Sequence, residues 1–575
     1  MAQASTFQRL PGFILKKICQ YTTLRHVEHR KPSGVDGSFR FTYRTDLFNS
    51  LCKEWTEVAS ELYFRDYTID VLGDQNDVNG SGKLNVKNVP LSSFSPLVKR
   101  VCINLDLEAI FSGRALDLLK NSIYSAAAFP IARTAQFTLM SNFSVGIENI
   151  EYKNAADNLN DFVEAMKPMF PKVVRICVLP GVGDDATNSN FYARYVQFVE
   201  LVCSHNWQSA IEVDWPTRAS QLMPTVVTGL SALLIDMPND VGMVEALVHQ
   251  NASTLSSLRI SNPPLDGCVN VFETPCGKAV FYPMLEKLAV SSLQKVPKPN
   301  YSLGDAPVLL PRLADLAVLW GHPFHDDVLF RGNNATLKRV LLMLDEEFMV
   351  ILNKFKVFGV SNRPKLKHAT LWNNPLGRGG TAEQSRLFNL LALSMASKVQ
   401  YLVLQSRTPT DMLVSSITQQ PAIATLQCLK LINSTLSFGT LLALIESLPL
   451  LSEIALMKLV PEQKHSEMDM RTLLEHLIAS YRPLSNRLQY VKYCTGKVED
   501  SMDYEATCSM FLALLCPRFT RFVVNGWLRK KFNRGIRNAI KTEPFINYAE
   551  RLGRLAFNDV GENNMKFKAR PLGSY

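Results

Sequence analysis

Glycine-containing turns are the first candidates for chemistry, because bare backbone can cradle a phosphate. A GxGxxA spacing follows an apolar run that is typical of a strand, with Gly181 and Gly183 as its glycines. Asp184 and Asp185 lie inside this turn and would repel a pyrophosphate. A second glycine-rich turn, 376–381, lacks the lysine that a P-loop needs. We interpret both as turns between repeats and keep a nucleotide-binding α/β enzyme as an alternative function.

Histidine and aspartate gather in the segment GHPFHDD, which contains His322, His325, Asp326 and Asp327. Two histidines three residues apart can share a metal, but a site needs further ligands and buried support. The segment follows an apolar strand and is therefore interpreted as a surface turn, as is the pair His26 and His29. The loop 74–80 lacks the terminal glutamate of a calcium loop. We expect neither a metal nor a cofactor.

Nucleophilic catalysis has no local motif in this sequence, because no nucleophile, base and orienting acid stand at a recognisable spacing. Triads can also be assembled from distant residues, so an enzyme stays open as an alternative. We assign no catalytic residue and expect a non-catalytic protein.

A basic cluster runs from Arg529 to Lys541 without an acidic residue and supplies much of the net charge of +10. Such a cluster could contact nucleic acid, an acidic partner or a nuclear import receptor. Charge runs are more often a solvated helix face, here with Phe532 and Ile536 turned inward. We adopt that interpretation and do not expect nucleic-acid binding.

A short pattern recurs along the chain: apolar, two residues, apolar, one residue, apolar. Successive copies start roughly 24 to 37 residues apart. They begin at Leu230, Leu255, Leu285, Leu313, Leu337, Leu366, Val399, Leu426, Leu451, Leu488, Phe519 and Leu552. Val98 and Val173 begin earlier copies, Ala132 begins a weak one, and 207–215 fits badly. The last two apolar positions are two apart, as a half-buried strand requires.

Helical periodicity fills the stretches between these strands. Leu441, Leu444 and Leu448 lie on one helix face, with Ser437 as the predicted N-cap and Pro449 ending the helix. Thr381 and Gln384 have the spacing of a capping box and predict another helix start.

One strand and one helix per repeat cannot bury their own apolar faces, so neighbouring repeats must stack. The predicted fold is an α/β solenoid of parallel strands and outer helices over 95–575, most secure over 230–557. A doubly wound α/β enzyme would need similar alternation and is the rival fold.

The repeats resemble the irregular leucine-rich-repeat family, whose longer units carry a convex helix. That family commonly places Asn or Cys three positions after the last apolar residue of the strand. Asn374 occupies this place, while Asn262 and Asn433 fall one residue early. The resemblance implies a binding scaffold.

Two short amphipathic helices are predicted before the repeats, one within 10–21 and one within 47–64. Pro11 is tolerated at the start of the first helix. Helices this short need another surface to pack on.

This N-terminal segment, 1–72 with an insertion at 22–43, resembles an F-box, and 73–94 is interpreted as a linker. The family binds a Skp-type adaptor, joins a cullin ubiquitin ligase and often carries leucine-rich repeats that select the substrate. The resemblance assigns adaptor binding or F-box stabilisation to Leu10, Pro11, Ile14, Ile18, Leu51, Cys52 and Trp55. Phe13 stands where the family commonly has an acid. The alternative is a helical cap on a ligase-independent repeat scaffold.

Composition is that of a folded protein, with 47% hydrophobic and 20% charged residues. The eleven cysteines include no CxxC pair, which fits a reducing compartment. The first twenty residues lack a signal peptide's apolar run, and no segment is long and apolar enough to span a membrane. We expect a soluble protein of the cytoplasm, the nucleus or both, whose protein substrate the sequence does not identify.

Overall fold

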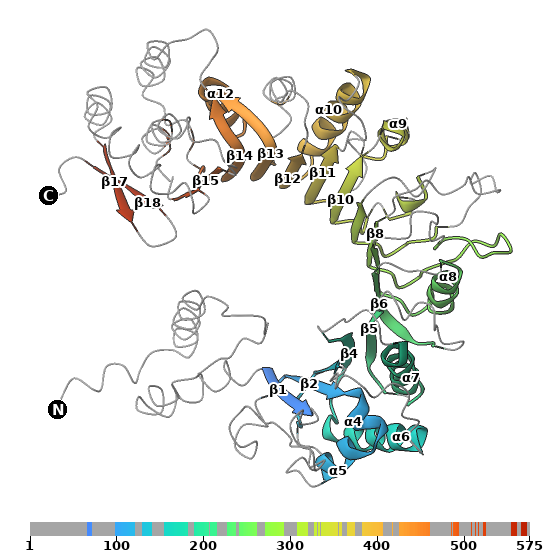
Figure 1. The fold of residues 1–575 in the computed structure, drawn as a ribbon. Coiled ribbons are helices and arrows are strands. Elements are labelled where there is room, and N and C mark those ends of the chain that lie inside the picture. The colour runs from blue at the N-terminus through green and yellow to red at the C-terminus, as the bar shows by residue number, and fades with distance from the viewer. Residues whose placement is uncertain are drawn as a thin grey trace, which may run out of the picture. The chain divides into compact units, whose positions relative to one another are not determined.

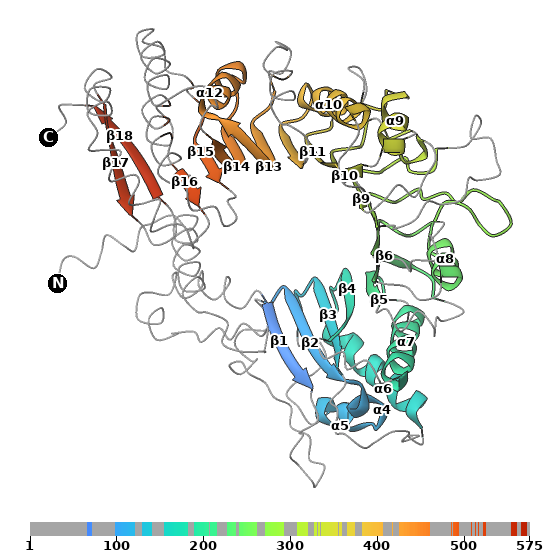
Figure 2. The same cartoon turned by 45° about the horizontal axis from the view of Figure 1, so that its top comes forward.

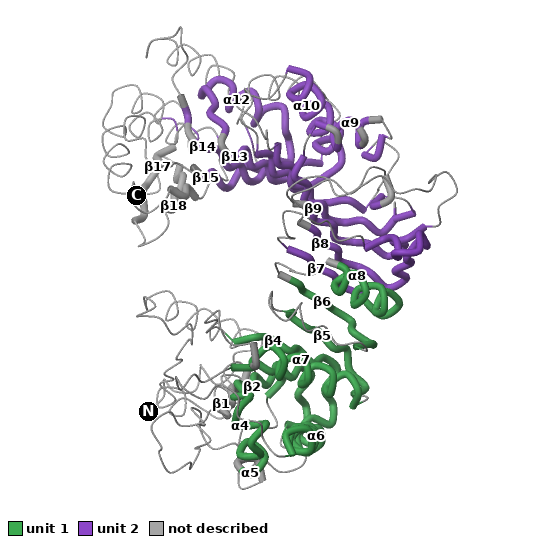
Figure 3. The backbone as a smooth tube through the Cα atoms, turned by 45° about the vertical axis from the view of Figure 1, so that its right-hand side comes forward, with its two compact units in different colours: residues 1–255 green, residues 256–575 purple. Residues whose placement is uncertain are grey.

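A computed structural model describes the following parts of the chain: 66–71, 98–120, 129–140, 154–181, 189–205, 207–215, 227–236, 241–261, 271–291, 308–319, 327–330, 332–333, 335–344, 346–354, 356–358, 365–373, 382–405, 417, 425–460, 485, 487–493, 508, 512, 516, 521–524, 554–560 and 565–571. The chain divides into two compact units, Met1–Leu255 and Ser256–Tyr575, which Figure 3 colours separately.

Unit 1 is a parallel sheet with helices on one side (Figure 2). Its described strands pair in chain order, each with the next. They are β1 (Asp66–Val71), β2 (Arg100–Asp106), β3 (Thr134–Met140), β4 (Arg175–Pro180), β5 (Ala210–Trp215) and β6 (Leu230–Asp236). The helices are α4 (Leu107–Phe111), α5 (Arg114–Lys120), α6 (Ala155–Met166), η4 (Lys167–Met169), α7 (Ser189–Ser204) and α8 (Val241–Gln250).

Unit 2 repeats this arrangement, with α9, α10 and α12 on one side of its strands (Figure 1). Its parallel strands also pair in chain order. They are β7 (Ser257–Ser261), β8 (Lys287–Ser291), β9 (Asp315–Leu319), β10 (Arg339–Leu344), β11 (His368–Asn373), β12 (Tyr401–Gln405), β13 (Cys428–Ser437), β14 (Glu453–Val460), β15 (Tyr490–Tyr493) and β16 (Arg521–Val524). The helices are η7 (Asp327–Phe330), α9 (Glu346–Lys354), α10 (Ala382–Ala396) and α12 (Phe438–Ser447).

The recurring apolar pattern forms the core of both units. Its middle positions align as paired neighbours from strand to strand in unit 2: Leu258, Leu288, Leu316, Val340, Ala369, Leu402, Leu429, Ile454, Val491 and Phe522. Those from Leu258 to Val491 are at most 3% exposed. Full burial of one such leucine or valine side chain stabilises the fold by about 1.5–3 kcal/mol. The predicted α/β solenoid, an irregular leucine-rich-repeat array with outer helices, is confirmed.

The N-cap predicted at Ser437 is present. The Thr440 N–H donates to Ser437 Oγ at 3.1 Å, and α12 ends at Ser447, two residues before Pro449. The helix predicted after Thr381 is α10, which begins at Ala382. Its Gln384 side chain reaches the preceding strand, where Nε2 donates to Asn373 Oδ1 at 3.1 Å.

A buried asparagine stabilises the repeats at a position before the strand, where the leucine-rich-repeat pattern does not predict one. Asn251, fully buried after α8, accepts from the Leu230 N–H at 2.9 Å. Its Nδ2 donates to Val227 O at 2.7 Å and to Leu247 O at 2.9 Å. These bonds join the end of the helix to the strand before it.

Asn333 repeats this role in unit 2, where its Nδ2 donates to Leu329 O at 2.7 Å. Thr336, three residues later, donates from Oγ1 to Leu313 O at 2.9 Å, as Thr254 does to Leu230 O at 2.7 Å. The sequence signal is therefore Asn-x-x-Thr-Leu just before a strand. Asn374 and Asn262 lie outside the described residues, as does the side chain of Asn433.

The region 207–215, which fits the pattern badly, nevertheless forms β5. Ile211 and Val213 pair with Ile176 and Val178 of β4, and all four are buried. Buried Trp207 lies near the place where other repeats have their first apolar residue, so one large side chain just before the strand replaces the usual leucine.

The pattern starting at Leu552 was expected to be another parallel repeat, and this expectation is wrong. β17 (Arg554–Val560) pairs antiparallel with β18 (Met565–Pro571), and β18 pairs antiparallel with β16. The spacing of apolar residues is the same in parallel and antiparallel strands, so it could not show that β18 would pair with β16 and separate β17 from it.

The N-terminal segment 1–65 lies outside the described residues, so its helices remain a prediction. β1 lies within the range 1–72 that was assigned to the F-box-like segment and pairs in parallel with β2. The described part of the sheet therefore begins earlier than residue 95.

Replacing Asn251 with alanine would leave the Leu230 N–H and two carbonyl groups without their buried partner. We expect the free energy of unfolding to fall by about 1–3 kcal/mol, the usual cost of an unsatisfied buried polar group. Chemical denaturation followed by circular dichroism measures this loss. Ser253→Ala, at an exposed neighbouring position, is the matched control, and an equal loss in both variants would contradict the proposed role.

Candidate binding surface

The side chains that alternate with the core residues form the second face of each sheet, opposite the helices, which we call the strand face. In β11, Ala369 and Leu371 are buried, whereas His368, Thr370 and Trp372 are half-buried. Because successive side chains of a strand point to opposite sides, each repeat adds two or three residues to this face. The strand faces are therefore broad surfaces of side chains from many repeats.

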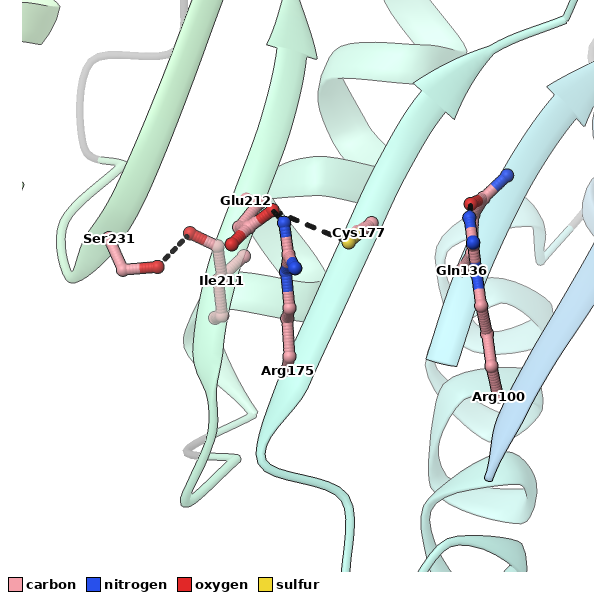
Figure 4. Close-up of polar contacts among 7 residues, drawn as sticks. All are labelled: Arg100, Gln136, Arg175, Cys177, Ile211, Glu212 and Ser231. Atoms are coloured by element: carbon pink, nitrogen blue, oxygen red, sulfur yellow. Dashed lines mark hydrogen bonds and ion pairs between the residues drawn. The ribbon is translucent and has the colours of Figure 1, made fainter. Parts of the chain in front are cut away.

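In unit 1, β4 and β5 carry an ion pair on the strand face (Figure 4). The Arg175 guanidinium binds the Glu212 carboxylate, with the arginine side chain 54% exposed and the glutamate 25%. The Cys177 thiol donates to the same Glu212 oxygen at 3.5 Å. Burial and the neighbouring Glu212 carboxylate raise the pKa of Cys177 to about 11, so this thiol stays protonated at neutral pH and is a poor nucleophile.

Arg100 and Gln136 make a second polar contact on the same face, between β2 and the adjacent β3 (Figure 4). Gln136 Nε2 in turn donates to Thr138 Oγ1 at 3.4 Å. Ser231 on β6 donates to the Ile211 carbonyl of β5 at 3.0 Å. Polar contacts thus cross neighbouring strands of unit 1 and fix the positions of its outward side chains.

In unit 2, β9 to β12 present a row of interacting side chains. Arg339 holds Asp315 with two hydrogen bonds, Nε to Oδ1 at 2.7 Å and Nη2 to Oδ2 at 2.5 Å. This contact raises the pKa of Arg339. His368 stacks on Tyr401, with ring centroids 4.5 Å apart and planes 13° from parallel. Each contact joins residues that are paired across adjacent strands.

Farther along unit 2, Lys430 Nζ lies 3.1 Å from Glu453 Oε1. Cys428 is buried beside this pair, and burial, followed by the charge of Glu453, raises its thiol pKa to about 12. A thiol with such a pKa is inert at neutral pH. The face therefore offers charged, aromatic and apolar contacts.

The pKa of His368 is lowered, first by partial burial and then by the positive charges of Arg339 and Lys367. Asp315 opposes this shift. His368 is consequently neutral at pH 7, and its ring is available for packing and hydrogen bonding.

The residues assigned to the F-box resemblance lie outside the described residues, as do His322, His325, Gly183 and the basic cluster at Arg529–Lys541. The strand-face contacts were not predicted individually from the sequence. Those between strands involve partners 20 to 37 residues apart, and the only sequence signal is their place between the apolar positions of each strand.

Gly181 has a structural role. Its N–H donates to the Leu139 carbonyl and continues the pairing of β4 with β3. A Cβ at this position would lie 2.7 Å from Met140 Cγ and 2.9 Å from Leu139 O, so the close approach of the two strands requires glycine. Its amide is therefore engaged and cannot also bind a phosphate.

Within the described residues, no helix combines the length and apolarity needed to cross a membrane. No group of three or more His, Cys, Asp or Glu side chains in that part of the chain is placed to hold a metal ion.

Comparison with known proteins gives weak likenesses only. No family model matches the sequence, and no curated protein matches it. Among solved structures, the chain is similar to one in the crystal structure of the TLR13–ssRNA13 complex, with 10% identity and a TM-score of 0.36 over 75% of this chain and 49% of that one. It is also similar to one in the crystal structure of the Rad7–Elc1 complex in yeast, with 11% identity and a TM-score of 0.24 over 86% and 91%.

The chain thus spans about half the length of the first of these structures. The parallel strand pairing and the buried apolar residues of the repeats, and not these likenesses, establish the fold of the two units.

Substituting Arg339 with glutamine should raise the pKa of His368 towards its ordinary value of about 6.5. The change removes one positive charge that lowers this pKa and leaves Asp315, which raises it. An NMR titration of the His368 ring, assigned with a His368→Gln variant, measures the shift. Arg312→Gln, which removes an exposed charge that does not act on His368, should leave the pKa unchanged. A pKa that stays fixed in Arg339→Gln contradicts the electrostatic coupling.

Gly181→Ala should lower the melting temperature with or without nucleotide, because the added methyl group collides with the backbone of Leu139. We expect a loss of about 1–3 kcal/mol, as for other overpacked positions. In the wild-type protein, millimolar ATP or NAD should leave the melting temperature unmoved. A nucleotide-dependent rise in the wild type, lost in the variant, would instead support a nucleotide site at this turn.

Proposed function

We propose that this protein is a substrate receptor of a Skp–cullin-type ubiquitin ligase and performs no chemistry itself. The strand faces hold a target protein, and the N-terminal segment 1–72 docks the adaptor. The observation that supports the binding role is the strand face of unit 2, on which paired charged and aromatic side chains such as Arg339, Asp315, His368 and Tyr401 lie on successive strands. The resemblance of the N-terminal segment to an F-box supports the link to the ligase.

The mechanism would be proximity. Holding a target beside the transferring enzyme raises the effective concentration of the reacting groups without any new catalytic group. The construction of each unit suits this task, because its described strands are hydrogen-bonded to their neighbours and contacts between strand-face side chains fix their positions. The raised thiol pKa values of Cys177 and Cys428 fit a binding surface better than a thiol-dependent active site.

A ligase-independent scaffold is the second candidate function. It uses the same strand faces, but its N-terminal helices only cover the end of the array. The two functions differ in one property, the binding of the adaptor. A nucleotide-binding enzyme has less support, because the amide of Gly181 is already bonded to Leu139.

Trp55→Ala should abolish binding to a purified Skp-type adaptor without unfolding the repeats. Loss of a large aromatic side chain at the centre of an interface commonly costs about 2 kcal/mol or more, which corresponds to at least a thirtyfold weaker complex. Isothermal titration calorimetry measures the affinity, and circular dichroism reports on folding. Leu10→Ala should act in the same direction.

Phe281→Ala is a suitable control, because it removes another aromatic side chain, 49% exposed, from unit 2. This variant should bind the adaptor normally. If the wild-type protein itself fails to bind, the ligase role is wrong and the scaffold remains.

A further inference from the structure

The residue immediately before each strand from β8 to β15 extends the sheet by one more backbone hydrogen bond. The Lys338 N–H donates to Ala314 O at 2.8 Å, Lys367 N–H to Lys338 O at 2.9 Å, and Gln400 N–H to Lys367 O at 2.9 Å. Neighbouring strands lie about 4.8 Å apart. These bonds therefore hold Lys338 and Lys367 side by side at the start of β10 and β11.

Positively charged residues gather at this place beside the neutral His368, and we call Lys338, Arg339, Lys365 and Lys367 the basic edge. The three lysines and Arg339 are exposed, and His368 is half-buried. Among the described residues, no acidic side chain forms an ion pair with any of the three lysines. Arg339 is bound to Asp315 but uses only two of its N–H groups in that contact.

The field at the basic edge is positive. After partial burial, which is the larger cause, the positive charges of Arg339 and Lys367 lower the pKa of His368, and Asp315 raises it. Next to the basic edge, the stacked rings of His368 and Tyr401 offer a flat aromatic surface, with Tyr401 38% exposed. Positive charge and an exposed ring therefore lie on adjacent strands.

Acidic residues lie at the strand starts farther along the sheet on both sides of the basic edge. Glu286 lies just before β8, and Glu453 begins β14. A long polyanion such as nucleic acid, running along the strand starts, would meet these carboxylates. A short ligand would lie near Asp315, whose carboxylate is already paired with Arg339. Lys338 and Lys367 start adjacent strands, so each can pair with its own carboxylate of a segment that crosses the strands.

We infer that the basic edge binds a short, extended, acidic segment of the target protein. Glutamate or aspartate side chains pair with Lys338, Lys365 and Lys367, and an aromatic or apolar side chain packs on Tyr401. At about 3.3 Å per residue, such a segment would cover the starts of β10 to β12 with roughly three to five residues. The inference rests on the proposed function in one respect, that the strand side of unit 2 receives the target.

The test uses the full chain and a fluorescein-labelled peptide of alternating glutamate and tyrosine, followed by fluorescence anisotropy. The wild-type protein should bind the peptide, and added salt should weaken the complex because the contacts are exposed. The double variant Lys338→Glu with Lys367→Glu should bind about tenfold more weakly or worse. A peptide of alternating glutamine and tyrosine should bind poorly.

A matched control carries the same change in net charge elsewhere. Lys172→Glu with Lys278→Glu alters two exposed lysines, one in unit 1 and one in the turn 274–278, and should bind the acidic peptide like the wild type. Circular dichroism melting curves of both double variants report whether each is folded. Equal losses in the two double variants would show a general effect of charge and overturn the inference.

Two further outcomes would also overturn it: no binding of the acidic peptide by the wild type, or a uridine oligonucleotide that binds more tightly and depends on the same lysines. Adaptor binding, measured on the same preparations, separates this inference from the proposed function. Adaptor binding without peptide binding removes only the acidic-segment inference. Peptide binding without adaptor binding removes the ligase role and leaves the basic edge in place.

Discussion

The backbone hydrogen-bond ladder from each strand to the next is the interaction on which everything else in the two units depends. No repeat can bury its apolar residues alone, so every strand is stable only beside its neighbours. The ladder even includes the residue before each strand, as the bond from Gln427 N–H to Gln400 O illustrates. Because the ladder sets the spacing, side chains of different repeats meet at regular intervals on the strand face.

The repeat pattern predicted most of this arrangement, because an apolar residue is required wherever a strand faces the helices. Leu316, Val340 and Leu402 were placed in the core from their spacing alone, and they are paired or aligned across strands as expected. The pattern was least informative at β5, because only Ile211 and Val213 match it and buried Trp207 lies near the place of the usual first leucine. It also could not show that β18 would pair with β16 and so separate β17 from the parallel strands.

The candidate surface was predictable only in outline. The alternation of apolar and polar residues predicts which side of a strand faces solvent. A contact such as that of Arg339 with Asp315 depends in addition on the register between two repeats of unequal length. Asn251 was missed for a related reason, since two of its partners, Leu230 and Val227, lie more than twenty residues earlier in the chain. The shared spacing of Asn251 with Thr254 and of Asn333 with Thr336 was present in the sequence, yet two copies are too few to stand out from chance.

The antiparallel hairpin of β17 and β18 has a consequence for association between molecules. A parallel sheet that simply stops leaves a row of unpaired N–H and C=O groups, which can template a strand from another chain. Residues Arg521 and Phe522 of β16 already pair with Lys566 and Met565 of β18. A strand arriving from another molecule in the parallel sense would have to displace this pairing, so the hairpin hinders direct extension of the parallel sheet at β16 by a second molecule.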